Sequence, residues 1–125
     1  MREREIIAEF WRRMAANDFA AAGALLGPDF VLEWPQSRER IRGAARFIQM
    51  NAEYPAHGPW QFTVQRIVGG NGEGVSDVEV TDGVQKARAI SFFTLSEGKI
   101  TRLVEYWPEP YDPPANRAHL VEPIS

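Results

Sequence analysis

The spacing of apolar residues changes from helical to strand-like halfway along the chain, and this change limits the fold more than any other feature. In the first half they recur every three or four residues, as Ile6, Phe10 and Met14 do, which is typical of amphipathic helices. In the second half they alternate, which is typical of strands. Helices are expected at 3–16, 19–26 and 44–54, and strands at 30–34, 60–68, 74–81, 84–96 and 99–108. Helices followed by a meander of strands predict an α+β fold, in which three N-terminal helices cover one face of a curved antiparallel sheet.

A chain of 125 residues is long enough for one domain with a core and too short for two. We expect this domain to span residues 1–108, with the polar stretch "SRERIRG" as a loop inside it. Five prolines lie between 108 and 125, so residues 109–125 are predicted to form an extended, proline-rich C-terminal arm. The arm is expected to wrap a partner subunit, because its apolar residues would otherwise be exposed. These are Tyr111, Leu120, Val121 and Ile124.

Composition excludes several classes of function. The net charge of −3 gives no electrostatic attraction to nucleic acid or to an anionic membrane surface, and no apolar run is long enough to span a bilayer. The absence of cysteine excludes thiolate chemistry and zinc–thiolate sites, and the two histidines are too far apart to suggest a metal site. We therefore predict no metal and no cofactor. The N-terminus is too charged for a signal peptide, which predicts a cytoplasmic location.

Two short turns predict how the strands of the meander pair. If Asp82-Gly83 and Glu97-Gly98 form two-residue hairpin turns, then Asp77 lies opposite Arg88, and Ile90 lies opposite Glu105. The face that carries these four residues also carries Val75, Phe92, Leu103 and Trp107, and its mixture of apolar and charged groups suits a pocket closed by the helices. The other face would carry Ser76, Val78, Ala87, Ala89, Ser91, Val104 and Tyr106, which suits packing against a second copy. A one-residue bulge would exchange the two faces.

The order of elements, together with "NDFAAAGALLGPDFVLEWP", "RIRG" and "FFTLSEGKITRLVEYW", resembles a known family. The chain is similar over residues 3–108 to the SnoaL-like domains of the nuclear-transport-factor-two-like superfamily. This resemblance implies a conical fold that encloses a pocket between sheet and helices, and a homodimer formed through the outer sheet face. It does not imply one reaction, because the same fold serves isomerases, cyclases, epoxide hydrolases, dehydratases and non-catalytic binders.

The ketosteroid isomerases of this superfamily provide a specific comparison. They place a carboxylate base just before the proline that ends the first strand, a tyrosine on the first helix, and a protonated acid on the third strand of the meander. In this sequence the three places fall on Trp34, Phe10 and Ile90. None of these residues accepts a proton, and the indole N–H of Trp34 is only a donor. The resemblance therefore predicts a different reaction, with its acid–base groups elsewhere.

Asp77, Glu105 and Arg88 are the candidate catalytic residues. Glu105 beside Ile90 would have a raised pKa and could act as a general acid or base, unless the register slips and it faces solvent. Asp77 could be a base held ionised by Arg88, or Arg88 could bind a ligand carboxylate. Equally, the two could form a structural ion pair across the strands.

A set of mainly aromatic residues is expected to form the pocket wall. It comprises Phe10, Trp34, Phe47, Met50, Asn51, Tyr54, Ile90, Phe92 and Trp107. Several indole and phenol groups around one cavity favour a small apolar or aromatic ligand. Two hypotheses follow: a cofactor-independent isomerase, cyclase or hydrolase that uses acid–base chemistry, or a non-catalytic ligand-binding or dimeric interaction module.

Overall fold

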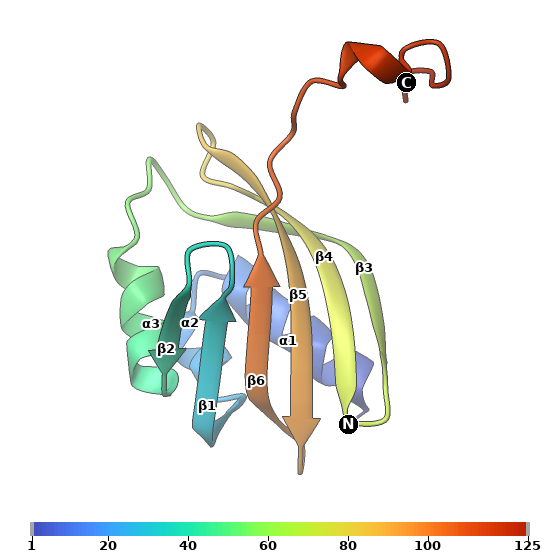
Figure 1. Ribbon diagram of the computed structural model, residues 1–125. Coiled ribbons are helices and arrows are strands. Elements are labelled where there is room, and N and C mark those ends of the chain that lie inside the picture. The colour runs from blue at the N-terminus through green and yellow to red at the C-terminus, as the bar shows by residue number, and fades with distance from the viewer. Residues whose placement is uncertain (1, 125) are drawn as a thin grey trace.

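A computed structural model describes residues 2–124 and contains a curved six-stranded sheet with helices packed on one face (Figure 1). The elements follow in the order α1 (Glu3–Ala15), α2 (Phe19–Gly23), β1 (Leu26–Trp34), β2 (Glu39–Arg42), α3 (Ala44–Glu53), β3 (Gln61–Gly70), β4 (Glu73–Thr81), β5 (Lys86–Ser96), β6 (Lys99–Tyr106) and the 3-10 turn η1 (Ala115–Arg117). The strand order across the sheet is β2-β1-β6-β5-β4-β3. The α+β architecture expected from the sequence is confirmed, and the sheet remains open. Within residues 2–124 the structure contains no helix that is both long and apolar enough to span a membrane.

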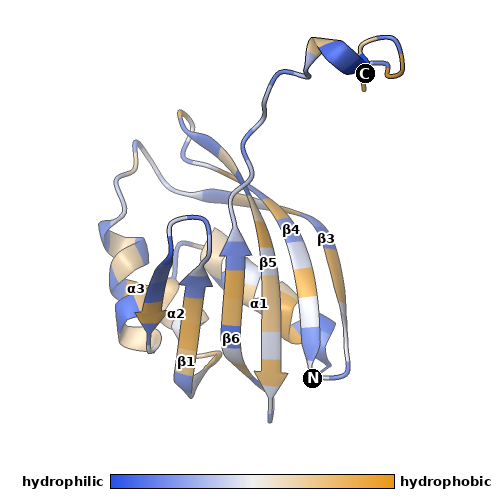
Figure 2. Cartoon of the chain, in the orientation of Figure 1, coloured by the Kyte–Doolittle hydropathy of each residue, from blue (hydrophilic) through white to orange (hydrophobic). Residues whose placement is uncertain are grey.

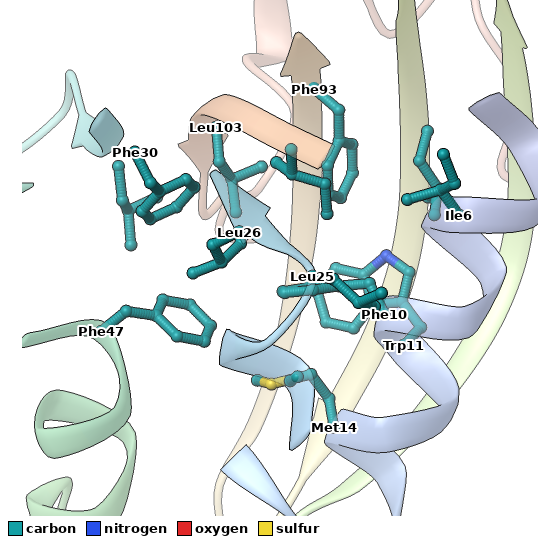
Figure 3. Packing of buried hydrophobic residues seen from close by; sticks show 14 of the residues in the cluster. Ile6, Phe10, Trp11, Met14, Leu25, Leu26, Phe30, Phe47, Phe93 and Leu103 are labelled. Atoms are coloured by element: carbon teal, nitrogen blue, oxygen red, sulfur yellow. The ribbon is translucent and has the colours of Figure 1, made fainter. Parts of the chain in front are cut away.

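The helices bury the residues that the spacing pattern selects. The inner side of α1 places Ile6, Phe10, Trp11 and Met14 against the sheet, where they meet core residues of the strands (Figure 3). The short α2 begins after Asp18, whose side chain accepts a hydrogen bond from the backbone N–H of Ala21. Side-chain caps of this kind satisfy backbone donors that the first turn of a helix leaves free. The helices therefore form one wall of a space whose other wall is the inner face of the sheet.

The first part of the sheet differs from the expectation in two respects. The stretch predicted as a polar loop contains β2, which pairs with β1 through Leu32 and Ile41. In addition, β1 runs parallel to β6, with Leu32 opposite Leu103, so the sheet is mixed and not purely antiparallel. Both differences have one cause. Strand β1 pairs with β2 on one side and with β6, far along the chain, on the other. A local sequence pattern does not show which strands become neighbours across such a distance.

Two of the three meander turns are tight hairpin turns. Asn71 and Gly72 join β3 to β4 with positive φ at both residues, and Glu97 and Gly98 join β5 to β6 in the same way. The third turn is wider than predicted, because Thr81 pairs with Lys86 and four residues lie between them. Asp82 does not adopt a positive φ there; its side chain is buried and accepts backbone hydrogen bonds.

The predicted faces of β4 and β5 are wrong, whereas those of β6 are correct. A bulge changes the register of β5 against β6 between Thr94 and Leu95, so Glu105 pairs with Ser91 and not with Ile90. An extra residue in one strand reverses the facing of every residue beyond it. The inner face accordingly carries Ser76, Val78, Ala89, Ser91, Phe93, Leu103 and Glu105. The outer face carries Val75, Asp77, Arg88, Ile90, Phe92, Val104 and Tyr106.

Beyond β6 the chain leaves the body of the molecule (Figure 1). Residues 108–124 are all exposed, and their only regular structure is the single turn η1. Figure 2 shows apolar residues concentrated along the strands, with the arm mostly polar and a few apolar positions near its end.

Candidate functional site

A cavity of about 630 Å³ lies between the inner sheet face and the helices. It opens near the ends of β1 and β6, where Trp34 and Trp107 contribute to its wall. Of the residues expected at the pocket, the structure brings together Phe10, Trp34, Phe47, Met50, Asn51, Tyr54, Glu105 and Trp107. The remaining apolar wall comes from Trp11, Met14, Trp60, Phe62, Val80 and Ala87.

The carboxyl group of Glu105 is the buried acid of this cavity. Glu105 is only 6% exposed to solvent. The indole Nε1–H of Trp34 donates a hydrogen bond to Oε1 at 3.2 Å, and the hydroxyl of Ser91 donates one to Oε2 at 2.9 Å. Both partners follow from strand pairing. Ser91 of β5 lies directly opposite Glu105. On the other side, Glu33 of β1 pairs with Val104 of the parallel strand β6. The residues that follow these two, Trp34 and Glu105, therefore lie side by side and face inward.

Burial raises the pKa of Glu105, and the hydrogen bonds from Trp34 and Ser91 offset part of this effect. A carboxyl group in apolar surroundings loses hydration when it ionises, so its neutral form persists to higher pH. Its two hydrogen-bond donors partly replace that hydration, so the ionised form is still accessible. The arrangement therefore provides one group that can give up and recover a proton inside an aromatic cavity.

Aromatic rings dominate the rest of the cavity wall. The rings of Phe10 and Phe47 lie 5.8 Å apart at its inner end, and those of Tyr54 and Trp60 meet edge to face at 5.8 Å nearer the solvent. The indole of Trp11, also in the wall, donates its N–H to Ser76 Oγ at 2.9 Å. Apolar walls with few polar groups are typical of sites that bind small apolar molecules.

The charged groups of the wall are mainly acidic. Glu39 and Glu109 lie in it together with Glu105, and Lys86 is the only basic residue among its lining residues. Such a balance disfavours a ligand with a carboxylate or phosphate group.

Asp82 connects two loops beside the cavity. Its carboxylate accepts hydrogen bonds from the backbone N–H of His57 at 2.8 Å and from that of Gln85 at 2.6 Å, as well as from the Gln85 side chain. Burial raises the pKa of Asp82, but these hydrogen bonds outweigh that effect and hold the pKa below its usual range. The imidazole Nδ1 of His57 lies 3.0 Å from the same carboxylate. Gln85 lines the cavity, and the ionised carboxylate of Asp82 holds it by hydrogen bonds, so Asp82 helps to fix the shape of the opening.

The structure places four of the expected site residues away from the cavity. Asp77 and Arg88 form an ion pair on the outer sheet face, where Arg88 Nε donates to Asp77 Oδ1 at 2.7 Å and lowers the pKa of that carboxyl. Ile90 and Phe92 lie on the same face, and Phe92 is largely exposed. The expectation that these residues line the pocket is wrong, and the β5–β6 bulge is the physical reason.

Sequence reasoning missed Ser91 and Trp60. Ser91 was assigned to the outer face because the bulge was not visible in the sequence. Trp60 was read as the start of a strand, although its position just after the turn that follows α3 placed it near Tyr54. The structure described for residues 2–124 contains no cluster of three or more acidic, histidine or cysteine side chains that could hold a metal ion.

Comparisons with known proteins agree with the fold. The SnoaL-like domain family matches residues 7–103. A solved structure from Kribbella flavida, described as a "putative ketosteroid isomerase", is 33% identical with a TM-score of 0.90, covering 98% of this chain and 89% of that one. An NTF-2-like protein of unknown function from Burkholderia xenovorans is 26% identical with a TM-score of 0.82, covering 98% and 94%. An LEH-like epoxide hydrolase from M. tuberculosis is 20% identical with a TM-score of 0.69, covering 84% and 81%, and shares the fold. A comparison with curated proteins finds no significant match.

Proposed function

The chain belongs to the SnoaL-like domain family, and from this premise we propose that it acts on a small, neutral, apolar molecule by acid–base chemistry centred on Glu105. One observation supports this proposal above the others: a single buried carboxyl group, hydrogen-bonded by Trp34 and Ser91, faces an aromatic cavity. Isomerase, cyclase and hydrolase chemistry all use such a group. The proposed role belongs to a strand different from those that the ketosteroid isomerase comparison suggested.

Among these reactions, a single carboxyl group supports proton transfer most directly. In its ionised form Glu105 removes a proton from a carbon next to a ligand carbonyl, which leaves an enolate, and the resulting acid returns the proton to the same or another carbon. A base whose pKa lies closer to neutral pH than that of an ordinary carboxyl is well matched to this task. Adding water to a ligand would require two groups, a base that activates the water and an acid that protonates the ligand. The aromatic wall would hold the ligand, and the acidic rim favours a neutral one.

Deuterium uptake tests this proposal without knowledge of the natural ligand. Neutral bicyclic ketones, with 2-tetralone as the first probe, are incubated with the protein in deuterated buffer, and exchange next to the carbonyl is followed by NMR. We expect the protein to accelerate exchange, and Glu105→Gln to lower the rate at least about 100-fold, as removal of a general base does. Glu109→Gln is the matched control, because Glu109 lies at the exposed rim. Equal rates for Glu105→Gln and the unmodified protein would contradict the proposal, and so would a panel of ketones without acceleration.

A non-catalytic binding module is the second candidate, and one observation favours it. Both carboxylate oxygens of Glu105 already have hydrogen-bond partners from this chain, so the group could serve only to orient Trp34 and Ser91. In that case native mass spectrometry of the purified protein would detect a retained ligand, and Glu105→Gln would bind it as tightly as the unmodified protein.

We also propose that the protein forms a homodimer through the outer sheet face. Four strands contribute a continuous apolar row there, in which each residue pairs with the next across the sheet: Val68, Val75, Phe92 and Val104. The ring of Tyr106 meets that of Phe92 edge to face at 6.0 Å. The ion pair of Asp77 and Arg88 borders this row. A row of exposed apolar side chains with charges of both signs beside it suits contact with an identical face.

A further inference from the structure

The C-terminal arm has apolar side chains that do not pack on the body of its own chain. Tyr111 is 79% exposed, Leu120 76% and Ile124 101%, and residues 108–124 are all exposed. The arm still has defined local structure, since η1 closes with a hydrogen bond from the N–H of Ala118 to the carbonyl of Ala115. A segment that is locally ordered but has its apolar residues in water indicates a missing partner.

Prolines keep the end of the arm away from the body from which it comes. Between residues 108 and 114, four of seven positions are proline. Proline-rich segments are semi-rigid spacers with a rise of about 3.1 Å per residue, so this stretch carries the end of the arm roughly 20 Å outward. Figure 1 shows the arm projecting from the end of β6 in this way. A stiff spacer of this length disfavours folding back of Leu120, Val121 and Ile124 onto their own cavity opening.

The base of the arm and the outer sheet face border one groove. Its volume is about 870 Å³. Pro108, Glu109 and Pro110 form one side, while Glu79, Arg88 and Ile90 are among the residues on the other. A second molecule packed on this end of the outer face would therefore lie beside the base of the arm. The apolar row does not line the groove itself, but it lies farther along the same face, since Phe92 follows Ile90 on the outer side of β5.

Two solved structures match this chain through the arm as well as the body. Each covers 98% of the 125 residues, which leaves about two or three residues unmatched, whereas residues 108–125 number eighteen. Both are more than 25% identical to this chain. The structural match with these relatives therefore extends into the arm.

From these observations we propose that the arm is exchanged between two copies: the arm of one copy lies on the body of the other and holds the dimer together. One identical partner covers both the apolar row and the apolar end of the arm, and two-fold symmetry makes each arm reciprocal. An unrelated protein would have to provide a separate surface for each. This inference rests on the dimer proposed above, and the test separates the two.

The first part of the test measures dimer affinity in the full-length chain by sedimentation equilibrium. The variant Leu120→Ser, Val121→Ser, Ile124→Ser keeps the length and the prolines of the arm. We expect its dissociation constant to rise at least about tenfold, because burial of even one aliphatic side chain contributes that much. The matched control is Asn116→Ser, Ala118→Ser, His119→Ser, which alters three neighbouring positions of the same arm and is expected to leave the constant unchanged.

The second part locates the arm, using the fact that the chain has no cysteine. Ala118→Cys carries a nitroxide spin label and is mixed with ¹⁵N-enriched protein of unmodified sequence, which has no thiol to label. Intermolecular broadening of amide signals from body residues of the enriched copy is expected. If the protein dimerises without such broadening, and the apolar variant has an unchanged constant, arm exchange is wrong and the dimer stands. A second sample, in which the spin-labelled chain is itself ¹⁵N-enriched and is diluted with protein that has neither label nor enrichment, reports broadening within one chain. Broadening in this sample without intermolecular broadening in the first would mean that the arm folds back, and the inference would also be wrong. If the unmodified protein is monomeric throughout, both proposals fail.

Discussion

The side chain of Trp34 links the sequence of β1 to the protonation of Glu105. Sequence comparison suggested that this position, just before Pro35, had lost a catalytic base and held part of the pocket wall. In the structure its N–H donates to Oε1 of Glu105. An indole N–H only donates, so Oε1 stays an acceptor in the neutral acid. We therefore expect the acid proton on Oε2, where the Ser91 hydroxyl would then accept a hydrogen bond and no longer donate the one seen in the structure. The residue at the place of the usual base is thus a donor to another acid.

Substitution of Glu105 by glutamine should change how stability depends on pH. Glutamine imitates the neutral acid, because its oxygen can accept from Trp34 while its amide donates to Ser91. The raised pKa of Glu105 means that the folded state retains a proton that the unfolded state has lost, so the stability contributed by this proton is complete at low pH and is lost as pH rises through the folded pKa. Glu105→Gln has no such loss. Urea unfolding at a series of pH values should give similar free energies near pH 4, and a growing advantage for Glu105→Gln from about pH 4.3, the ordinary value, upward.

A constant difference between the two proteins across this range would show that the pKa of Glu105 is the same in the folded and unfolded states. Glu109→Gln, at the exposed rim, controls for the loss of one negative charge and should follow the unmodified protein at every pH.

Replacement of Trp34 by phenylalanine should raise the pKa of Glu105 further. The hydrogen bond from the Trp34 indole lowers this pKa, and phenylalanine keeps an aromatic wall without the donor. The measurement is an NMR titration of the ¹³C-labelled Glu105 carboxyl group. Trp107→Phe is the control, because Trp107 lines the same cavity and no hydrogen bond joins its indole to Glu105. A pKa that falls or stays the same in Trp34→Phe would mean that the indole does not stabilise the ionised form.

At the scale of elements, the buried side of α1 packs closely against strand β4 of the sheet. Gly74 of β4 lies beneath this helix, and a Cβ atom placed there would lie 2.3 Å from Ile7 Cδ1 and 2.9 Å from the carbonyl oxygen of Val68. The second contact is with backbone, which cannot move aside as a side-chain end does. We expect Gly74→Ala to lower the free energy of unfolding by about 1–3 kcal/mol, as overpacking of a core does, measured by urea unfolding.

Gly27 provides a matched control for this substitution. It is also a buried strand glycine, but its added Cβ would meet only ordinary contacts, the nearest being Thr101 Cγ2 at 3.5 Å. Gly27→Ala should therefore be neutral or slightly stabilising, since alanine reduces the freedom of the unfolded chain. Equal effects of the two substitutions would mean that backbone freedom, and not crowding against α1, determines the result.

The sequence predicted the positions of most helices and strands well, but it predicted poorly which face of the sheet each strand residue occupies. Strand β5 shows why. Its boundaries and those of α1 were close to the observed ones, because apolar spacing and the Glu97-Gly98 turn define them locally. Facing requires one side of a strand to be clearly more apolar. In β5 the outer Ile90 and Phe92 are as apolar as the inner Phe93 and Leu95, so the pattern specifies no register and the bulge is invisible.

The sequence and the structure agree on the cavity wall where helices and strand ends form it. The pocket residues on α1 and α3 follow from helical spacing. Glu105 was expected in the pocket because the predicted register placed it on one face with Ile90 and Phe92. In the structure Thr101 of β6 has no partner in β5, so Glu105 faces inward while those two residues face outward. Its expected neighbours Ile90 and Phe92 were wrong for the same reason that Ser91 was missed. The polar environment of the acid therefore had to come from the structure, although the direction of its pKa shift was anticipated.

For the whole molecule, the two faces of the sheet divide the proposed roles. The inner face holds the acid and the cavity, and the outer face holds the apolar row with its neighbouring ion pair. Successive residues of one strand face opposite sides of the sheet, so a substitution can alter either the cavity or the proposed interface without altering the other. Neighbouring positions in β5 alternate between them: Ser91 contacts Glu105, while Phe92 faces outward.

Phe92→Glu tests the outer face as a dimer interface. In a two-fold interface each substitution occurs twice, so two aromatic side chains are lost and two negative charges are brought together. Burial of one phenylalanine contributes about 1.5–3 kcal/mol, so the dissociation constant should rise at least about 100-fold. Sedimentation velocity measures this shift. Val84→Glu makes an equivalent change at an exposed apolar residue of the β4–β5 loop, outside the row, and should leave the dimer intact. Because Phe92 is absent from the cavity wall, Phe92→Glu should retain the deuterium exchange activity expected of the monomer's cavity. A dimer that persists in Phe92→Glu would place the interface on another surface.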